Sequence, residues 1–176
     1  CDTWGERDGA SWVDDPQDVA ASVALVHRLV GSLRVAPERV VLGGFSQGAA
    51  VALLAALSFP RRLAGCAMIG GWLSYPTAEK VESGDWVHGS NAGLPVWWGH
   101  GTHDSSIPAS LLDEHSDTLD SLRPRAVERR RYPCGHWPTR EVLLDMFEWL
   151  RAVLASEQPA GLQTSSEACA AQPCPG

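Results

Sequence analysis

Apolar residues recur at every third or fourth position over residues 18–33, which is the spacing of one face of a helix. This pattern predicts an amphipathic helix that Asp18 caps and that Pro37 stops. Residues 48–58 are apolar on nearly every side, which predicts an interior helix that ends before Pro60. The first helix is therefore expected to cover a core and the second to lie within it.

A third amphipathic pattern follows Thr139, which we expect to cap a helix that runs to about residue 155. Residues 108–122 show the same pattern less regularly and predict a further helix. The inward-facing positions of the helix after Thr139 are expected to be Val142, Leu143, Met146, Phe147, Leu150 and Leu154.

Short apolar runs alternate with these helices and predict strands over residues 39–43, 63–70, 95–99 and 126–132. The last run carries alternating charges, which suit the edge of a sheet because they discourage pairing with other chains. Strands that alternate with helices at these lengths form βα units and a parallel sheet. The sequence therefore predicts an α/β protein with a partial parallel sheet of about four strands, flanked by helices.

Three segments show neither pattern. Residues 1–17 are typical of a loop, and residues 74–93 of a surface excursion. Residues 156–176 are rich in Ser, Ala, Gln, Pro and Gly and predict a disordered tail. We therefore expect one domain over residues 1–155, since a chain of 176 residues suits a single core.

The net charge of −7 argues against nucleic acid or an anionic membrane as a partner, because nothing gathers the 14 basic residues into a stripe. The cluster at residues 129–131 is interpreted as part of an exposed or edge strand. No apolar run is long enough to predict a membrane span, and the first residues lack the layout of a signal peptide. Five irregularly spaced cysteines suit reduced thiols, so we expect a cytoplasmic protein.

The segment from Gly44 to Gly48 reads Gly-Phe-Ser-Gln-Gly and lies between an apolar strand and an apolar helix. A strand, a sharp turn with small residues around a serine, and a helix together make a nucleophile elbow. This arrangement places Ser46 at a helix N-terminus, where the backbone N–H of Gln47 can donate to a developing oxyanion.

A serine nucleophile needs a base to remove its proton and a third group to orient that base. Asp104 follows the third predicted strand and His136 follows the fourth, so both belong to loops at the same edge of the sheet as Ser46. The chain order serine, aspartate, histidine is that of the α/β-hydrolases. We therefore expect Ser46, Asp104 and His136 to form a catalytic triad.

Two other interpretations concern the same loops. His100, His103 and Asp104 could be metal ligands, but a loop after a strand does not preset that geometry, so we expect no metal and an exposed His103. Cys134 lies two residues before His136 and is either a redox-sensitive thiol or a small turn residue. The sequence names no group that would stabilise its thiolate, which favours the turn residue.

A Phe-Ser-Gln-Gly elbow joined to a His-Gly-x-x-Asp turn is far more specific than Gly-x-Ser-x-Gly alone. On these motifs the chain resembles the acyl-protein thioesterase, lysophospholipase and carboxylesterase family of α/β-hydrolases. The resemblance extends from about Trp12 to Ala155. It rests on residues 11–14, 42–50, 71–73, 95–101 with Asp104, 132–136 and 148–150.

The resemblance implies hydrolysis of esters or thioesters with linear acyl chains, on small-molecule or protein-linked substrates, without a cofactor. It also implies that Trp72 lines the acyl site. Members of this family begin with further strands and a His-Gly-type loop that supplies a second oxyanion N–H, whereas residues 1–11 are all that precedes Trp12 here. We therefore expect an N-terminally truncated hydrolase whose nucleophile strand lies at a free edge of the sheet.

Two consequences are expected from this difference. The lack of one oxyanion donor would lower the rate by roughly 10²–10³. A free apolar edge would make the chain poorly soluble or prone to self-association. The alternative hypothesis is a catalytically impaired relative that acts by binding a partner at this edge.

Overall fold

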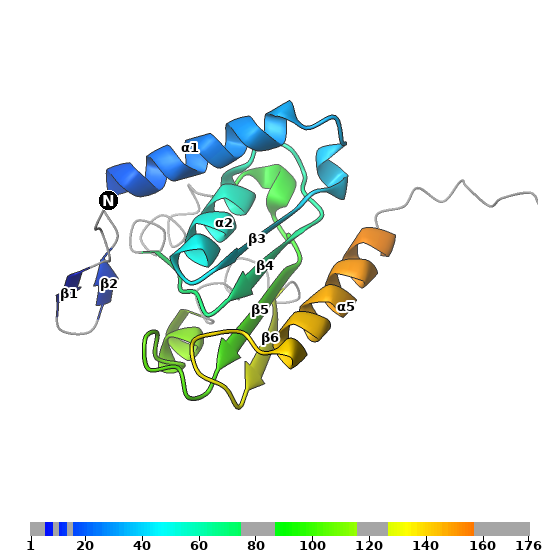
Figure 1. Cartoon of the computed structure of the whole chain (residues 1–176). Coiled ribbons are helices and arrows are strands. Elements are labelled where there is room, and N and C mark those ends of the chain that lie inside the picture. Colours follow the sequence, from blue (N-terminus) through cyan, green and yellow to red (C-terminus); the bar gives the residue numbers. More distant parts are fainter. Residues whose placement is uncertain (1–5, 9–10, 14–15, 75–86, 116–126, 157–176) are drawn as a thin grey trace, which may run out of the picture.

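The structure is a computed structural model that describes residues 6–8, 11–13, 16–74, 87–115 and 127–156. Strands of one parallel sheet are paired in chain order (Figure 1): β3 (Val41–Phe45), β4 (Gly65–Ile69), β5 (Val96–Gly101) and β6 (Val127–Tyr132). The prediction of a partial parallel sheet of four strands is confirmed.

Helices cover both faces of this sheet (Figure 1): α1 (Pro16–Ser32), α2 (Gln47–Ser58) and α5 (Arg140–Ser156). Successive side chains of β5 point to opposite faces. Trp98 lies in the main core with residues of α2, whereas Trp97 packs beside Val142 of α5. Both tryptophans are fully buried, so each forms the centre of one packed layer.

The helix boundaries differ slightly from those expected. Asp18 lies in the first turn of α1 and not at its cap, because the helix begins at Pro16, a residue that suits the first helical position. Pro37 lies beyond the end of α1 and opens a short 3-10 helix, η1 (Pro37–Arg39). That turn takes up residues expected in the next strand, so β3 begins at Val41.

The inward face of α5 is narrower than the sequence predicted. Val142, Met146 and Trp149 contact the core, but Leu143 and Phe147 are 37% and 56% exposed, so their expected burial is wrong. Each of these two residues lies one position beyond a core residue, which turns it about 100° round the helix. Because α5 packs mainly on one strand, β5, it buries only one narrow row of its side chains.

The N-terminal segment is not the loop expected from the sequence. β1 (Glu6–Asp8) and β2 (Ser11–Val13) pair as a separate antiparallel two-stranded sheet. Strands of three residues are too short to show an alternating pattern, which explains why the sequence did not reveal them. Residues 75–86 of the expected excursion and 116–122 of the expected helix lie outside the described part. So does the expected tail apart from Ser156, which ends α5.

The two edges of the sheet differ in chemistry. β6 lies at one edge, as predicted, and carries an ion pair between Arg130 and Glu128 at 2.6 Å. β3 lies at the other edge and, among the described strands, pairs with β4 alone. Its sequence, Val-Leu-Gly-Gly-Phe, contains no charged residue. The nucleophile strand is therefore at an apolar edge within the described part of the chain.

None of the helices in the described ranges combines the length and the apolar character that a membrane crossing requires.

Asn91, in the 3-10 helix η2 (Gly89–Asn91), is buried and bonds the segment between α2 and β4. Its Oδ1 accepts a hydrogen bond from the N–H of Leu63 at 2.9 Å, and its Nδ2 donates to the carbonyls of Phe59 and Arg61 at 2.7 and 2.9 Å. Buried polar groups are costly unless they are paired in this way. Asn91 therefore fixes the connection between α2 and β4.

We predict that Asn91→Asp lowers the free energy of unfolding by at least about 2 kcal/mol, because a carboxylate at this position faces two carbonyl oxygens. Urea denaturation followed by far-UV circular dichroism measures the change. Ser90→Asp adds the same charge at the exposed neighbouring position and should stay within about 0.5 kcal/mol of the unaltered chain. Equal stabilities of the two variants would contradict the role given to Asn91.

His115 links residues 110–115, which are helical, to the segment after β4. Its Nδ1 accepts a hydrogen bond from the N–H of Leu73 at 3.1 Å. Burial lowers the pKa of His115, and the charge of Glu114 opposes that shift. The folded chain therefore holds this imidazole neutral to lower pH than the unfolded chain does.

Because the folded state binds fewer protons at this site, its contribution to stability should be lost as the pH falls below about 6.5 toward the folded pKa. We predict that the melting temperature of His115→Asn falls less steeply between pH 7.5 and pH 5.5 than that of the unaltered chain. Differential scanning fluorimetry measures both slopes. His103→Asn, at an exposed position, should leave the slope unchanged. A His115→Asn slope equal to that of the unaltered chain would rule the linkage out.

Candidate active site

Ser46 occupies the turn between β3 and α2, as the sequence predicted. Its φ of 56° is the only positive value among the described non-glycine residues. Such a conformation persists only where the surroundings impose it. The Ser46 N–H donates to the carbonyl of Ile69 at 2.9 Å, and its carbonyl accepts from Ala49 at 2.9 Å. A Cβ at Gly44 would overlap the Gly48 carbonyl, so this sharp turn requires glycine there.

The structure brings the three predicted triad residues together. His136 Nε2 lies 3.0 Å from the Oγ of Ser46, and His136 Nδ1 lies 2.8 Å from the Oδ2 of Asp104. A carboxylate only accepts hydrogen bonds, so Nδ1 carries the proton of the neutral imidazole. Nε2 then presents its lone pair to the hydroxyl of Ser46, which is the arrangement of a general base and its nucleophile.

The carboxylate of Asp104 is held from its other side by the chain itself. Its Oδ1 accepts hydrogen bonds from the backbone N–H groups of Ser106 and Ile107, at 2.9 and 2.8 Å. Asp104 is buried, so these bonds replace the water that a carboxylate would otherwise bind. Oδ2 is thereby aimed at His136.

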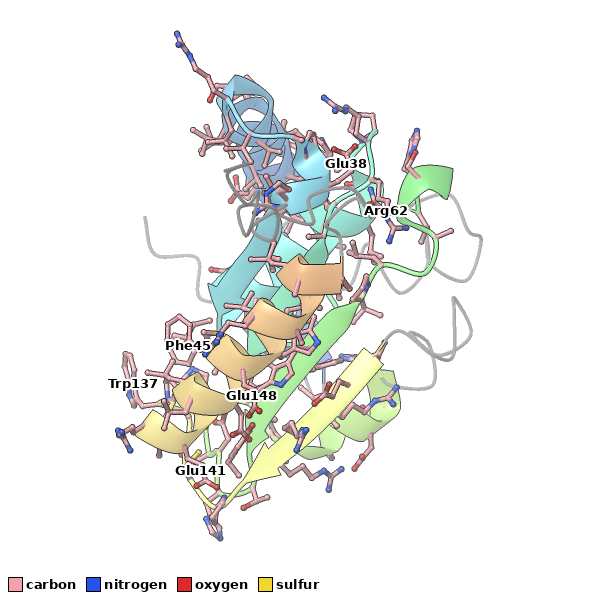
Figure 2. All side chains as sticks on the ribbon, turned by 90° about the vertical axis from the view of Figure 1, so that its right-hand side faces the viewer. Glu38, Phe45, Arg62, Trp137, Glu141 and Glu148 are labelled. Carbon is pink, nitrogen blue, oxygen red and sulfur yellow. The ribbon has the colours of Figure 1, made fainter. Side chains whose placement is uncertain are left out.

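Two groups that the sequence did not single out surround the imidazole of His136. The ring of Phe45 lies with its centroid 4.8 Å away, and Gly70, with a φ of +55°, passes beside the imidazole. Phe45 lies next to Trp137 (Figure 2). The centroids of the two rings are 5.2 Å apart. Trp137 is 75% exposed, so this aromatic group opens to the surface. The sequence could have indicated Phe45 as a site residue, because Phe45 directly precedes Ser46 in the elbow motif.

The two remaining predicted site residues are Gln47, which follows Ser46 in the chain, and Trp72, which follows β4. Gln47 is the first residue of α2, which places its backbone N–H at the positive end of the helix dipole. Trp72 is buried in a small cluster with Ala50, Ile107 and Leu111. It therefore packs between the helix that follows Ser46 and the turn that follows Asp104.

His100, His103 and Asp104, which the sequence offered as possible metal ligands, make other contacts in the structure. His100 is buried and its Nε2 lies 3.0 Å from the carbonyl oxygen of Ile107, whereas His103 is exposed, as expected. Among the residues described, no three His, Cys, Asp or Glu side chains gather as metal ligands would.

Two cysteines of the described part are free thiols. Burial raises the pKa of Cys66 to about 12. Burial and then the charges of Asp104 and Glu141 raise the pKa of Cys134, against a smaller opposite effect of the Thr139 backbone. Cys134 therefore remains a protonated thiol at neutral pH, which favours its interpretation as a small turn residue.

Known proteins were compared with this chain at the level of family, sequence and structure. Residues 3–154 match the family described as Phospholipase/Carboxylesterase. The chain is 35% identical over 125 residues to acyl-protein thioesterase 1 of Eremothecium gossypii, an alignment that covers 70% of this chain and 51% of the relative. It is 31% identical over 156 residues to acyl-protein thioesterase 1 of Gibberella zeae, covering 85% and 64%. The chain thus spans about half to two thirds of the length of these curated relatives.

Solved structures agree on the fold. A single-residue variant of SOBER1 from Arabidopsis thaliana superposes with a TM-score of 0.72 at 25% identity, over 80% of this chain and 67% of that one. Acyl-protein thioesterase 2 of Zea mays gives a TM-score of 0.74 at 24% identity, over 85% and 70%. The predicted α/β-hydrolase fold is therefore confirmed. With a family match that covers most of its length, the chain belongs to the phospholipase/carboxylesterase family.

Proposed function

We propose that this chain carries the catalytic triad of a serine hydrolase that cleaves carboxylic esters or acyl thioesters. The observation that carries the proposal is the continuous chain of hydrogen bonds from Ser46 through His136 to Asp104. Relatives named acyl-protein thioesterase 1 and probable carboxylesterase support this class of substrate. An acylated protein or a small acyl ester would be the substrate.

The mechanism follows from the direction of these hydrogen bonds. His136 Nε2 takes the proton of Ser46 as Oγ attacks the acyl carbonyl, and Asp104 stabilises the imidazolium that forms. His136 then returns the proton to the departing alkoxide or thiolate, which leaves an acyl-serine ester. Water, deprotonated by the same imidazole, releases the carboxylic acid and restores Ser46.

The N-terminus of α2 would stabilise the tetrahedral intermediate. We expect the backbone N–H of Gln47, the first residue of α2, to donate to the oxyanion, and the helix dipole would add to that donation. Trp72 would shape the acyl site from its buried cluster with Ala50 of α2 and Ile107 of the turn after Asp104. The free thiols of Cys66 and Cys134 suit the reducing cytoplasm, and that location stays a prediction.

We predict that Ser46→Ala lowers kcat for p-nitrophenyl esters and for an acyl thioester by roughly 10⁵–10⁶, and that Asp104→Asn lowers it by about 10⁴. The control is Ser58→Ala. Ser58 also has a histidine nearby, with His27 Nε2 3.4 Å from its Oγ, but its hydroxyl donates to the Leu54 carbonyl. Ser58→Ala should retain full turnover. Activity that survives in Ser46→Ala would refute the assignment.

A second function is favoured by the position of β3 at an apolar edge of the sheet. We propose that a second copy of the chain pairs with this edge, since an edge strand presents backbone groups that another strand can bind. The lack of charge on β3, in contrast to the ion pair on β6, supports this side of the sheet as the pairing edge.

We predict a concentration-dependent dimer in sedimentation velocity, and its loss in Gly43→Lys. Gly43 is exposed, and a Cβ there would meet the Ala67 carbonyl at 3.4 Å, so the side chain can be accommodated while its charge blocks strand pairing. Arg129→Ala, on the opposite edge strand, should leave the dimer intact. A chain that remains monomeric at every concentration, with full turnover, would exclude this second function.

A further inference from the structure

His100 is a buried histidine that the proposed reaction does not use. It lies near the end of β5, in the same register as Val96 and Trp98, so it belongs to the face of the sheet that α2 covers. The residue is 1% exposed. A buried polar ring is costly unless it is paired, so its hydrogen bonds should reveal why a histidine occupies this position.

The ring of His100 makes a hydrogen bond to a carbonyl group of the turn that follows Asp104. His100 Nε2 lies 3.0 Å from the oxygen of Ile107. A carbonyl only accepts hydrogen bonds, so Nε2 carries the proton and donates it. His100 Nδ1 is buried and has no hydrogen-bond partner among the described residues. Burying the unpaired Nδ1 of His100 costs free energy, whereas Nε2 of the same ring donates a hydrogen bond to Ile107.

Ile107, the residue that His100 holds, also supports Asp104. Ile107 donates its N–H to Asp104 Oδ1 at 2.8 Å and accepts from His100 at its carbonyl. His100 Nε2 also lies 3.6 Å from Asp104 Oδ2, beyond a hydrogen bond, and both side chains are inaccessible to solvent. His100 thus ties β5 to the turn that aims the carboxylate at His136.

We propose that His100 is a positioning residue, whose Nε2–H fixes the turn after Asp104 and thereby orients the carboxylate toward His136. This inference rests on the proposed function of the triad. It predicts that the donor at the Nε2 position matters, and not merely the volume of the ring. Gln places an amide nitrogen close to the position of Nε2, whereas Phe keeps a ring without a donor.

The matched control is His27. Its Nε2 lies 2.9 Å from the Ala55 carbonyl, so His27→Phe removes a hydrogen bond of the same kind between α1 and α2, remote from the triad. If the role of His100 were merely structural, His100→Phe and His27→Phe would both lower the stability of the chain. Neither variant would then change the hydrogen bonds of the triad. A positioning role predicts a difference between them at His136.

The test is proton NMR of the full chain combined with steady-state kinetics. The proton shared by His136 Nδ1 and Asp104 should give a resonance far downfield, which its loss in His136→Gln identifies. We expect this resonance to persist in His100→Gln and in His27→Phe, and to be lost or shifted upfield in His100→Phe. We expect His100→Phe to lower kcat roughly 10- to 100-fold with KM unchanged, and His100→Gln to restore most of that loss.

The proposal is overturned if His100→Phe, folded by its near-UV circular dichroism, keeps the resonance and the kcat of the unaltered chain. It is equally overturned if His100→Gln fails as His100→Phe does. Should His100→Phe not fold, His100→Asn replaces it, because its amide reaches the Nδ1 position and not Nε2. If the resonance behaves as expected while the unaltered chain and Ser46→Ala hydrolyse equally slowly, the positioning role stands and the proposed function fails.

Discussion

The buried carboxylate of Asp104 is the group on which the candidate site depends. Its Oδ1 is occupied by two backbone N–H groups, those of Ser106 and Ile107, so Oδ2 remains for the imidazole of His136. That bond fixes the tautomer of His136, and the tautomer decides whether Nε2 can accept the proton of Ser46. The reactivity proposed for Ser46, after β3, therefore depends on the turn that holds Asp104, after β5.

The parallel sheet supplies the geometry that makes this possible. The parallel strands β3, β5 and β6 have their carboxyl ends at the same end of the sheet, and Ser46, Asp104 and His136 follow them in that order. Each of these loops is fixed by short backbone contacts, such as the bond from Ser46 to the Ile69 carbonyl. The sheet thus brings together residues that are 90 positions apart in the chain.

The sequence predicted the parallel sheet, the interior helix and the juxtaposition of Ser46 and His136, because hydrophobic periodicity and chain order determine them. It did not predict the β1–β2 hairpin, whose strands are too short for a pattern, or the exposure of Phe147, which depends on which strip of α5 contacts the sheet. The sequence placed His100 in the loop after the third strand, but β5 extends to Gly101 and includes it. Its donation to the Ile107 carbonyl depends on the path of a turn that no local pattern encodes.

The central claim is that Ser46 in this chain is an activated nucleophile. Intact-mass spectrometry after treatment with a fluorophosphonate probe tests it directly, because the probe phosphonylates serines that an adjacent base deprotonates. We expect one adduct per 176-residue chain, and none in the Ser46→Ala or His136→Gln chain. A folded chain that forms no adduct, or an adduct that persists in Ser46→Ala, would contradict it.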